Sequence, residues 1–407
     1  MRPRFGLMGY TAIAFFVGLV VGFVLLAAPA EVRDVVLPWM RALGDIFIRL
    51  MRLVIPLVIF FTISASIAYM RDLVKLGRIL VATLATFYSL AFTATAIGVV
   101  AMMLIKPGVG VKIEMPGVTV PPPVSGYDLL MSLVRPDFGE LLTVGGSFSM
   151  ILLAIITGVA VIVLGDEGRR VYDYLRLGMN LVIRTIGVLS YYIPVAVFAY
   201  TVYILVSAGP VILTAYAKYV ATYTVFVNLH FLGIYSLILA VVGVSPIKAL
   251  KAIAKPWLIA FTTRSSAVTL PYTMEAARKM GLPDEVVNVV VPLGVTMHMD
   301  GSAMLHAMDT LFVAQLFGIE LAPYQLALVL LLPLITSTAT APVPGGGLAL
   351  RGFLFSSVGV PLEGIPIITV PMPIHDPLST YVNACGDAVA ATLVAKIGGY
   401  RISSSEN

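Results

Sequence analysis

Charged residues are scarce in this sequence, because Asp, Glu, Lys and Arg together supply only 12% of its 407 residues. The single cysteine, Cys385, excludes an intrachain disulfide. No His-Glu-x-x-His element and no nucleophile-base pair is present, which argues against an intramembrane metalloenzyme. Any chemistry must therefore come from a small number of polar side chains, and these gather in the last third of the chain.

Hydrophobic residues dominate instead, at 59% of the chain with a mean hydropathy of +1.00. A helix needs roughly 20 mostly apolar residues to cross a hydrocarbon layer of about 30 Å. Ordinary spans are predicted at about 9–29, 38–70, 77–105, 144–164, 178–208 and 211–243. The first follows Arg2 and Arg4 as a signal peptide would, but it is longer than a normal signal core, so we expect a span. The composition predicts an all-α polytopic membrane protein with eight transmembrane spans.

The net charge of +5 does not form a patch, so no nucleic-acid partner is expected. The cations lie between hydrophobic runs on alternate sides, at Arg2 and Arg4; Arg71, Lys75 and Arg78; Arg169, Arg170 and Arg176; Lys248, Lys251 and Lys255. This positive-inside pattern predicts a plasma-membrane protein whose N-terminus and C-terminus are cytoplasmic. Arg49 and Arg52 lie inside the second run, where snorkelling or helix pairing would explain them.

From Lys248 onward the apolar segments become short and are broken by Ser, Thr, Gly, Pro, Asp and His. Two of them place apolar arms around a small polar tip: about 248–280, with its tip at 264–271, and about 323–360, with its tip at 337–347. Irregular backbone at membrane depth is tolerated only where it is buried in protein or lines a wet cavity. We therefore predict two re-entrant helical hairpins that face each other at a transporter's midplane site.

Two further spans carry ionisable side chains that hydrocarbon would not tolerate. Span seven contains His298, Asp300, His306 and Asp309, and span eight contains His375, Asp376, Asn383 and Asp387. Such groups by default face a cavity and serve function. Gly301 and Pro377 would permit local unwinding, which frees carbonyl oxygens to bind cations. His230 in span six is expected to form a helix-helix hydrogen bond or to relay protons.

Five motifs follow one another along the chain: Arg49-Leu-Met-Arg-Leu-Val-Ile-Pro-Leu, Thr263-Arg-Ser-Ser, Met299-Asp300-Gly301, Val343-Pro-Gly-Gly-Gly and Val382-Asn383-Ala-Cys-Gly-Asp387. In this order they resemble the dicarboxylate/amino acid:cation symporter family, which includes archaeal aspartate transporters and animal glutamate transporters. The resemblance covers essentially the whole chain and implies a homotrimer with an elevator mechanism. It implies a fixed scaffold formed by residues 1–76 and 106–208, and a sliding transport domain formed by residues 77–105 and 209–407.

The resemblance also implies which residues surround the solute and the coupling ions. The implied substrate residues are Ser265, Ser266, Ser302 (at a family threonine position), Ser337, Thr340, Val343, Pro344, Gly345, Asp376, Ser379, Thr380 and Asn383. Asp387, with carbonyls near Gly294 and Asn383, would hold one cation. Thr296, with the carbonyls of Ser337 to Thr340, would hold a second. The coupling ion implied by the resemblance is Na⁺ or H⁺.

Several departures from the family pattern fall on these ligands. Ser379 replaces an arginine that grips the substrate's side-chain carboxylate, so bidentate recognition from span eight is lost. His298 replaces a sodium-binding asparagine, and Leu90 and Ala91 replace a Thr-Ser pair of another sodium site. Pro342 replaces a glycine at the second hairpin tip and removes a backbone donor.

The polar groups that remain are imidazoles and carboxylates, which bind divalent transition metals such as Zn²⁺, Ni²⁺ or Co²⁺, whereas sodium binds oxygen ligands. The residues expected to bind such a metal are His298, Asp300, His306, His375, Asp376 and Asp387. The metal would be the cargo or a co-ligand of an organic solute, and the Asp-rich core favours a cationic cargo. The nearby methionines are expected to pack rather than to ligate.

Two alternatives to the metal site stay open, because His298 and His375 would also suit proton exchange or hydrogen bonding to an ordinary amino acid. The protein would then be a proton- or sodium-coupled symporter of a neutral amino acid or carboxylate. A channel would share polar re-entrant segments, but its filter is usually a repeated ring motif. Two hairpins of unlike sequence favour alternating access instead. We therefore expect a secondary active transporter of a small polar solute.

Overall fold

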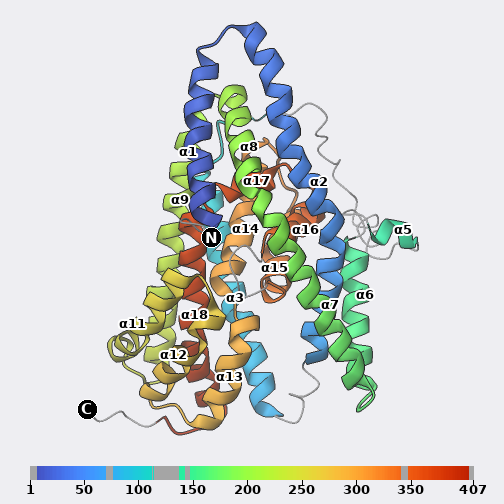
Figure 1. The fold of residues 1–407 in the computed structure, drawn as a ribbon. Coiled ribbons are helices and arrows are strands. Elements are labelled where there is room, and N and C mark those ends of the chain that lie inside the picture. Colours follow the sequence, from blue (N-terminus) through green and yellow to red (C-terminus); the bar gives the residue numbers. More distant parts are fainter. Residues whose placement is uncertain are drawn as a thin grey trace, which may run out of the picture.

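The computed structural model describes residues 7–69, 77–111, 113, 137–142, 147–340 and 347–402. Within these ranges the chain forms helices and turns without strands, in an elongated bundle (Figure 1). The described helices that are long and apolar enough to cross a membrane are Gly9–Leu26, Ala30–Tyr69, Arg78–Ile105, Gly168–Ala208 and Val211–Val241. Large apolar side chains such as Phe16 and Trp39 are more than 60% exposed on these helices. Such a surface suits lipid better than water.

A first group of helices packs around the long α2 (Ala30–Tyr69). Its other members are α1 (Leu7–Leu26), α6 (Ser147–Val163), α7 (Gly168–Leu189), η3 (Ser190–Tyr192) and α8 (Ile193–Ala208), and the short α5 (Phe138–Leu141) precedes α6. α1 also packs closely along α8, because Gly22 leaves room there for Leu205. In a membrane the hydrophobic effect does not drive helices together, so close packing at small residues such as Gly22 becomes important.

A second group packs around α18 (Met372–Ile397), which contacts most of its other long helices. Its other members are α3 (Arg78–Ile105), α9 (Val211–Leu229), η4 (His230–Ile234), α10 (Tyr235–Val241), α11 (Pro246–Thr263), α12 (Ser266–Lys279), α13 (Asp284–Met297), α14 (Asp300–Leu316), α15 (Pro323–Thr338), α16 (Leu348–Val358) and α17 (Gly364–Thr369). Figure 1 shows α11, α12 and α13 gathered with α18 toward one end of the molecule, away from the α1–α2 connection.

The first predicted hairpin is formed by α11 and α12, which turn sharply at residues 264 and 265. Arg264 adopts a left-handed conformation with φ of 53° and ends α11. Ser265 begins α12 as an N-cap, because its hydroxyl accepts a hydrogen bond from the Val268 N–H at 3.4 Å. The second hairpin is formed by α15 and α16, and residues 341–346 between them lie outside the described residues.

Span seven is interrupted as predicted, but the interruption precedes Gly301. α13 ends at Met297 and α14 begins at Asp300, so His298 and Met299 lie outside both helices. Pro377 does not unwind span eight, because α18 is helical from Met372 to Ile397. The expectation of unwinding at Pro377 was therefore wrong. Pro377 is the sixth residue of α18, so it removes only the one intrahelical hydrogen bond that its N–H would donate to the Pro373 carbonyl.

The described residues contain eight spans and two hairpins when α7–α8, α9–α10 and α13–α14 are each counted as one span. The predicted fold class is confirmed. The fifth span begins at Gly168, ten residues before the predicted start, because the polar face of α7 continues the helix beyond the apolar run. Buried methionines pack as expected: Gly98 of α3 leaves room for Met304 and Met308 of α14.

The two groups of helices also contact each other. α16 packs on α2, where Gly352 leaves room for Ile55. Arg52 of α2 forms an ion pair with Glu363, N to O 3.2 Å, at the start of α17. Pairing between helices, one of the two explanations expected for a charge at Arg52, therefore accounts for its presence in the apolar run.

Candidate functional site

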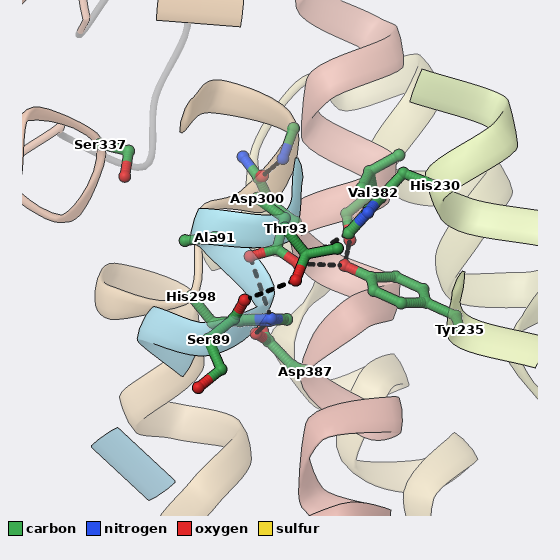
Figure 2. Close-up of polar contacts among 12 residues, drawn as sticks. Ser89, Ala91, Thr93, His230, Tyr235, His298, Asp300, Ser337, Val382 and Asp387 are labelled. Carbon is green, nitrogen blue, oxygen red and sulfur yellow. Dashed lines mark hydrogen bonds and ion pairs between the residues drawn. The ribbon is translucent and has the colours of Figure 1, made fainter. Parts of the chain in front are cut away.

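A network of buried polar side chains lies where α13, α14 and α18 meet (Figure 2). The imidazole of His298 lies between the carboxylates of Asp300 and Asp387. Its Nε2 is 3.3 Å from Asp300 Oδ1 in an ion-pair contact, and its Nδ1 is 3.2 Å from Asp387 Oδ1 in a hydrogen bond. All three side chains are at most 1% exposed. Such burial makes their mutual contacts the main source of charge compensation.

The network continues from Asp300 to span six. Asp300 Oδ2 is 2.9 Å from Nε2 of His230, and the Tyr235 hydroxyl donates a hydrogen bond to the same oxygen at 2.9 Å. His230 and Tyr235 are five residues apart, and the π-helical segment η4 begins at His230 and precedes Tyr235. A π-helical turn pairs residues at i and i+5, which brings both side chains to one carboxylate. The helix-helix hydrogen bond predicted for His230 is confirmed. We call His298, Asp300, Asp387, His230 and Tyr235 the His298 network.

Small and aromatic neighbours shape the space around His298. Its ring stacks on Phe87 of α3, with ring centroids 4.8 Å apart. A Cβ at Gly386 would lie 2.7 Å from His298 Cε1, and a Cβ at Gly294 would overlap the Asp387 carboxylate. Gly294 and Asp387, both implied to hold a coupling cation, are therefore adjacent. These glycines are needed because any side chain would displace the imidazole or the carboxylate.

The polar face of α18 contacts the start of α14. Asn383 Oδ1 accepts hydrogen bonds from the backbone N–H of Gly301 at 2.9 Å and of Ser302 at 3.3 Å, and its Nδ2 donates to Ser302 Oγ at 2.9 Å. Asn383 thus caps the first turn of α14. Ser379 and Thr380 lie one turn earlier and donate their hydroxyls to the Asp376 carbonyl oxygen. The structure brings this part of the implied substrate site together.

The hairpin tips contribute the rest of the implied site only in part. Ser265 and Ser266 are buried at the turn of the first hairpin. Ser337 is buried and its hydroxyl bonds to Leu334, while Thr340 bonds to Thr336. Figure 2 shows Ser337 apart from the His298 network. Val343, Pro344 and Gly345 lie outside the described residues, so their implied role stays a prediction.

The implied second cation site has its hydroxyls in local hydrogen bonds. Thr296 donates to the Leu293 carbonyl at 3.2 Å, and Ser337 donates to the Leu334 carbonyl at 3.4 Å. α13 and α15, which carry these residues, do contact each other. A cation there would depend on backbone carbonyls rather than on these two side chains.

A second cluster of buried polar groups lies between α9, α14, α16 and α18. Arg351 of α16 forms an ion pair with Asp309 of α14, Nε to Oδ2 2.8 Å, and Tyr219 of α9 donates its hydroxyl to Asp309 Oδ1 at 2.6 Å. The His375 ring packs against the rings of Tyr219 and Tyr223, and His306 Nδ1 lies 3.0 Å from Thr336 Oγ1. We call Arg351, Asp309, Tyr219, His306 and His375 the Arg351 cluster.

The predicted metal ligands are divided between these two places. His298, Asp300 and Asp387 belong to the His298 network, whereas His306 and His375 belong to the Arg351 cluster. The sixth predicted ligand, Asp376, follows His375 on α18 and belongs to neither group, and its Oδ2 has no hydrogen-bond partner among the described residues. Among the described residues, no group of three or more His, Cys, Asp or Glu side chains is arranged to hold a metal ion. The structure therefore does not assemble the predicted ligand set, because residues that share a span point to different neighbours.

Three participants were missed by the sequence reasoning: Arg351, Tyr219 and Tyr235. Arg351 follows the second hairpin tip without a recognisable motif, and its partner Asp309 is distant in sequence. Tyr235 would have been found only if the π-helical turn had been foreseen. A tyrosine in an apolar span is an ordinary occurrence, so it gave no local signal.

The geometry suits ion-coupled binding rather than covalent chemistry. A buried imidazole between carboxylates can hold or release a proton, and hydroxyl, amide and carboxylate groups can bind a small polar solute. The broken α13–α14 span and the two hairpins surround these groups, as in transporters whose discontinuous helices form the binding site.

Comparison with known proteins agrees with this arrangement. A proton/sodium-glutamate symport protein of Geobacillus stearothermophilus is 26% identical over 414 residues, covering 97% of this chain and 94% of the relative. The proton/sodium-glutamate symport protein of Bacillus subtilis (strain 168) is also 26% identical, covering 97% and 93%. A C4-dicarboxylate transport protein of Anaeromyxobacter sp. (strain K) is 28% identical, covering 88% and 83%.

The family comparison extends over nearly the whole chain. The sequence pattern of the sodium:dicarboxylate symporter family matches residues 7–397 of this chain of 407 residues. Such coverage includes both hairpins, the interrupted span and all residues of the His298 network. The chain is therefore a multi-pass membrane transporter rather than an enzyme, and it belongs to the sodium:dicarboxylate symporter family.

Proposed function

We propose that this protein is a symporter that couples the movement of a small carboxylate-bearing solute to protons bound in the His298 network. The observation that carries the proposal is the position of the His298 imidazole between Asp300 and Asp387. Each ring nitrogen faces a carboxylate oxygen. A neutral imidazole has one N–H, so one nitrogen would face a carboxylate with its lone pair. A protonated imidazole presents an N–H to both carboxylates.

Sodium coupling fits this network less well. Sodium requires oxygen ligands, and here an imidazole lies between the two carboxylates that would otherwise hold a cation. The buried side chains of Leu90 and Ala91 carry no oxygen at the two positions where the family pattern has a Thr-Ser pair, and Phe87 covers one face of the imidazole. A proton needs no such coordination shell, because His298 itself carries the positive charge between Asp300 and Asp387.

The proposed solute is a dicarboxylate or an acidic amino acid. The relatives named above are glutamate and C4-dicarboxylate transporters, and the face formed by Ser302, Thr380 and Asn383 offers hydroxyl and amide groups to such a molecule. This substrate differs from the cationic cargo that the Asp-rich core suggested. In the proposed protonated state, His298 carries a positive charge that offsets one of the two aspartates it contacts, so the core is less negative than its count of aspartates implies.

The proposed movement is the elevator mechanism, in which the group around α18 slides along the group around α2. The packing into two groups supports it, and contacts such as Arg52–Glu363 would then belong to one position of the transport domain. We further propose a homotrimer in the plasma membrane with both termini in the cytoplasm. The positive-inside distribution of cations supports this orientation.

A divalent metal as cargo or co-ligand is the competing proposal. It would require His298 to leave at least one carboxylate, and His306 and His375 to move toward Asp300 or Asp387. The described residues contain no preformed site of this kind. Proton coupling, sodium coupling and metal binding therefore predict different responses to ion gradients and to added metal.

The test is uptake by purified protein in liposomes, with labelled succinate and labelled glutamate as solutes. An inward proton gradient in sodium-free buffer is expected to drive accumulation, and a protonophore is expected to abolish it. A chelator should have no effect. Calorimetric titration with Ni²⁺, Zn²⁺ and Co²⁺ in detergent runs in parallel.

Uptake that follows a sodium gradient and ignores the proton gradient would overturn the proposal in favour of sodium coupling. Binding heat at micromolar metal that disappears in His298→Ala plus His375→Ala would favour the metal instead. A trimer is checked separately by mass measurement of the detergent-solubilised protein.

A further inference from the structure

Arg351 is unusual among the cations of this protein because its side chain is buried. It is 4% exposed, and among the described residues it is the one arginine or lysine in the buried class. Its Nε lies 2.8 Å from Asp309 Oδ2, and Nη1 lies 3.6 Å from Met372 Sδ. A guanidinium carries five N–H donors in a planar fork, so one carboxylate contact at Nε leaves donors for a second carboxylate.

Several polar atoms near Arg351 have no hydrogen-bond partner in the described chain. They are Nε2 of His306, both ring nitrogens of His375, Oδ2 of Asp376 and Nε of Arg351 itself, whose contact with Asp309 is an ion pair without hydrogen-bond geometry. Both imidazoles are 0% exposed. The positive charge of Arg351 acts on His306, His375 and Asp376, so these groups lie within its electrostatic range. Buried polar atoms in folded proteins nearly always have partners, so a group of unpartnered ones marks a place where a polar ligand fits.

The second hairpin connects this place to the binding site. Gly347 immediately precedes α16, and its carbonyl accepts a hydrogen bond from the Arg351 N–H at 3.0 Å. A Cβ at Gly347 would lie 2.9 Å from His306 Nε2, so the backbone of α16 begins against this imidazole. His375 directly precedes Asp376, which is the first of the implied substrate residues on α18. α18 itself carries one cation, Lys396, in its last turn.

We propose that Arg351, with His306 and His375, binds the second carboxylate of a dicarboxylate or acidic amino acid. The subsite rests on the proposed function and specifies its substrate class. Arg351 keeps Asp309 at Nε and offers its other N–H groups to the substrate, while each imidazole donates one N–H. Asp309 and Tyr219 hold the guanidinium in place. A second carboxylate here also links the substrate to α16, and hence to the second hairpin.

Arg264 is the alternative source of positive charge. It lies at the turn of the first hairpin and also acts electrostatically on Asp376. Its side chain is only partly buried and its backbone is in a left-handed conformation. The same substitution at Arg264 therefore serves as the matched comparison for Arg351.

The test is equilibrium binding to detergent-purified protein, by calorimetry, with succinate and its monoamide succinamate. Glutamate and glutamine form a second pair. The two members of each pair differ in one carboxylate, so the ratio of their affinities measures recognition of that group. Arg351→Gln is expected to lower this ratio by at least about 10-fold, because charged bidentate donors are lost. Arg264→Gln is expected to change this affinity ratio by less than about 3-fold, because the Arg264 guanidinium is not proposed to contact the second carboxylate.

A double variant separates recognition from folding. Arg351→Gln leaves Asp309 buried without its partner and can reduce folding, whereas Asp309→Asn plus Arg351→Gln removes both charges. The double variant is expected to fold, as judged by thermal unfolding, and still to lack the preference for the second carboxylate. Recovery of that preference in the double variant would show that the pair is only structural and would overturn the proposal. Loss of preference in Arg264→Gln instead of Arg351→Gln would also overturn it.

The binding assay uses no gradient, so its result does not depend on the coupling ion. If wild-type uptake ignores the proton gradient while the affinity ratio follows Arg351, only the proposed coupling fails. If wild-type protein binds succinate and succinamate, and glutamate and glutamine, equally well, the Arg351 subsite fails while proton coupling stands.

Discussion

The His298 network and the Arg351 cluster are both buried and both combine carboxylates with imidazoles, yet they differ in what faces those imidazoles. In the network, each carboxylate contacts an imidazole, and Asp300 also accepts from Tyr235. In the cluster, His375 has no hydrogen-bond partner at either nitrogen, although Arg351 and Asp309 are paired. The network also has atoms without a hydrogen bond, since His230 Nδ1 has no partner and His298 Nε2 meets Asp300 Oδ1 only as an ion pair. Carboxylates nevertheless face both ring nitrogens of His298, which suits a proton, whereas both ring nitrogens of His375 are left for a ligand.

This difference assigns separate roles to residues of the same type. His298 and His375 are both imidazoles on the core spans, and both were expected to bind one metal ion. Their surroundings now separate them, because His298 faces two carboxylates while His375 faces the rings of Tyr219 and Tyr223. The most informative experiments therefore make the same substitution in both places.

The largest effect is expected from His298→Gln compared with His375→Gln. Glutamine cannot carry a positive charge, so Asp300 and Asp387 would lose about 3 kcal/mol or more of compensation, as when one partner of a buried ion pair is removed. Uptake driven by a proton gradient in liposomes should fall roughly 100-fold, the factor that corresponds to such a loss. His375→Gln should keep the response to the proton gradient while raising the substrate KM.

The reverse outcome would exchange the roles of the two places. If His375→Gln removed the proton response and His298→Gln only raised KM, coupling would belong to the Arg351 cluster. Thermal unfolding of both variants in detergent provides the folding control, since only folded protein can be compared in liposomes.

A second, smaller effect tests whether the His298 network is as closely packed as its contacts indicate. A methyl group at Gly294 would overlap the Asp387 carboxylate, so Gly294→Ala should destabilise the protein by about 1–3 kcal/mol through overpacking. Gly187→Ala in α7 is the matched control, because a Cβ there meets nothing within 4 Å. The measurement is the thermal unfolding midpoint of each variant in the same detergent. Equal midpoints would mean that Asp387 can move away and that the network is looser than proposed.

The frame of the molecule was predictable from the sequence because its signals are local. Apolar arms around Ser265 and Ser266 predicted the first hairpin, and the turn does occur beside them. The interruption of span seven was also expected, although it precedes Gly301 and places the buried His298 in the break between α13 and α14. Polar and small residues disturb a helix at their own positions, so such features need no knowledge of the rest of the chain.

The division of the polar residues into two places was not predictable in the same way. His298 and His306 are eight residues apart, which would be about 12 Å along an unbroken helix, and nothing local shows that they face different helices. Arg351 lies on another element than Asp309, so only the folded arrangement pairs them. Composition suggested one His/Asp-rich site because counting residues cannot distinguish a carboxylate already paired from one that is free.

The smallest expected effects come from Tyr235→Phe and Tyr219→Phe, which remove one hydroxyl from each place. Each hydroxyl donates to a buried carboxylate, Asp300 at 2.9 Å and Asp309 at 2.6 Å, and such a hydrogen bond contributes about 1.5–3 kcal/mol. Tyr235→Phe should shift the pH of half-maximal uptake by about one unit, which corresponds to roughly 1.4 kcal/mol, without changing the preference between succinate and succinamate. Tyr219→Phe should weaken that preference and leave the pH dependence unchanged, because Asp309 then holds Arg351 less firmly. If both variants changed the same property, the two places would act as one unit, and the assignment of protons to one and of a carboxylate to the other would fail.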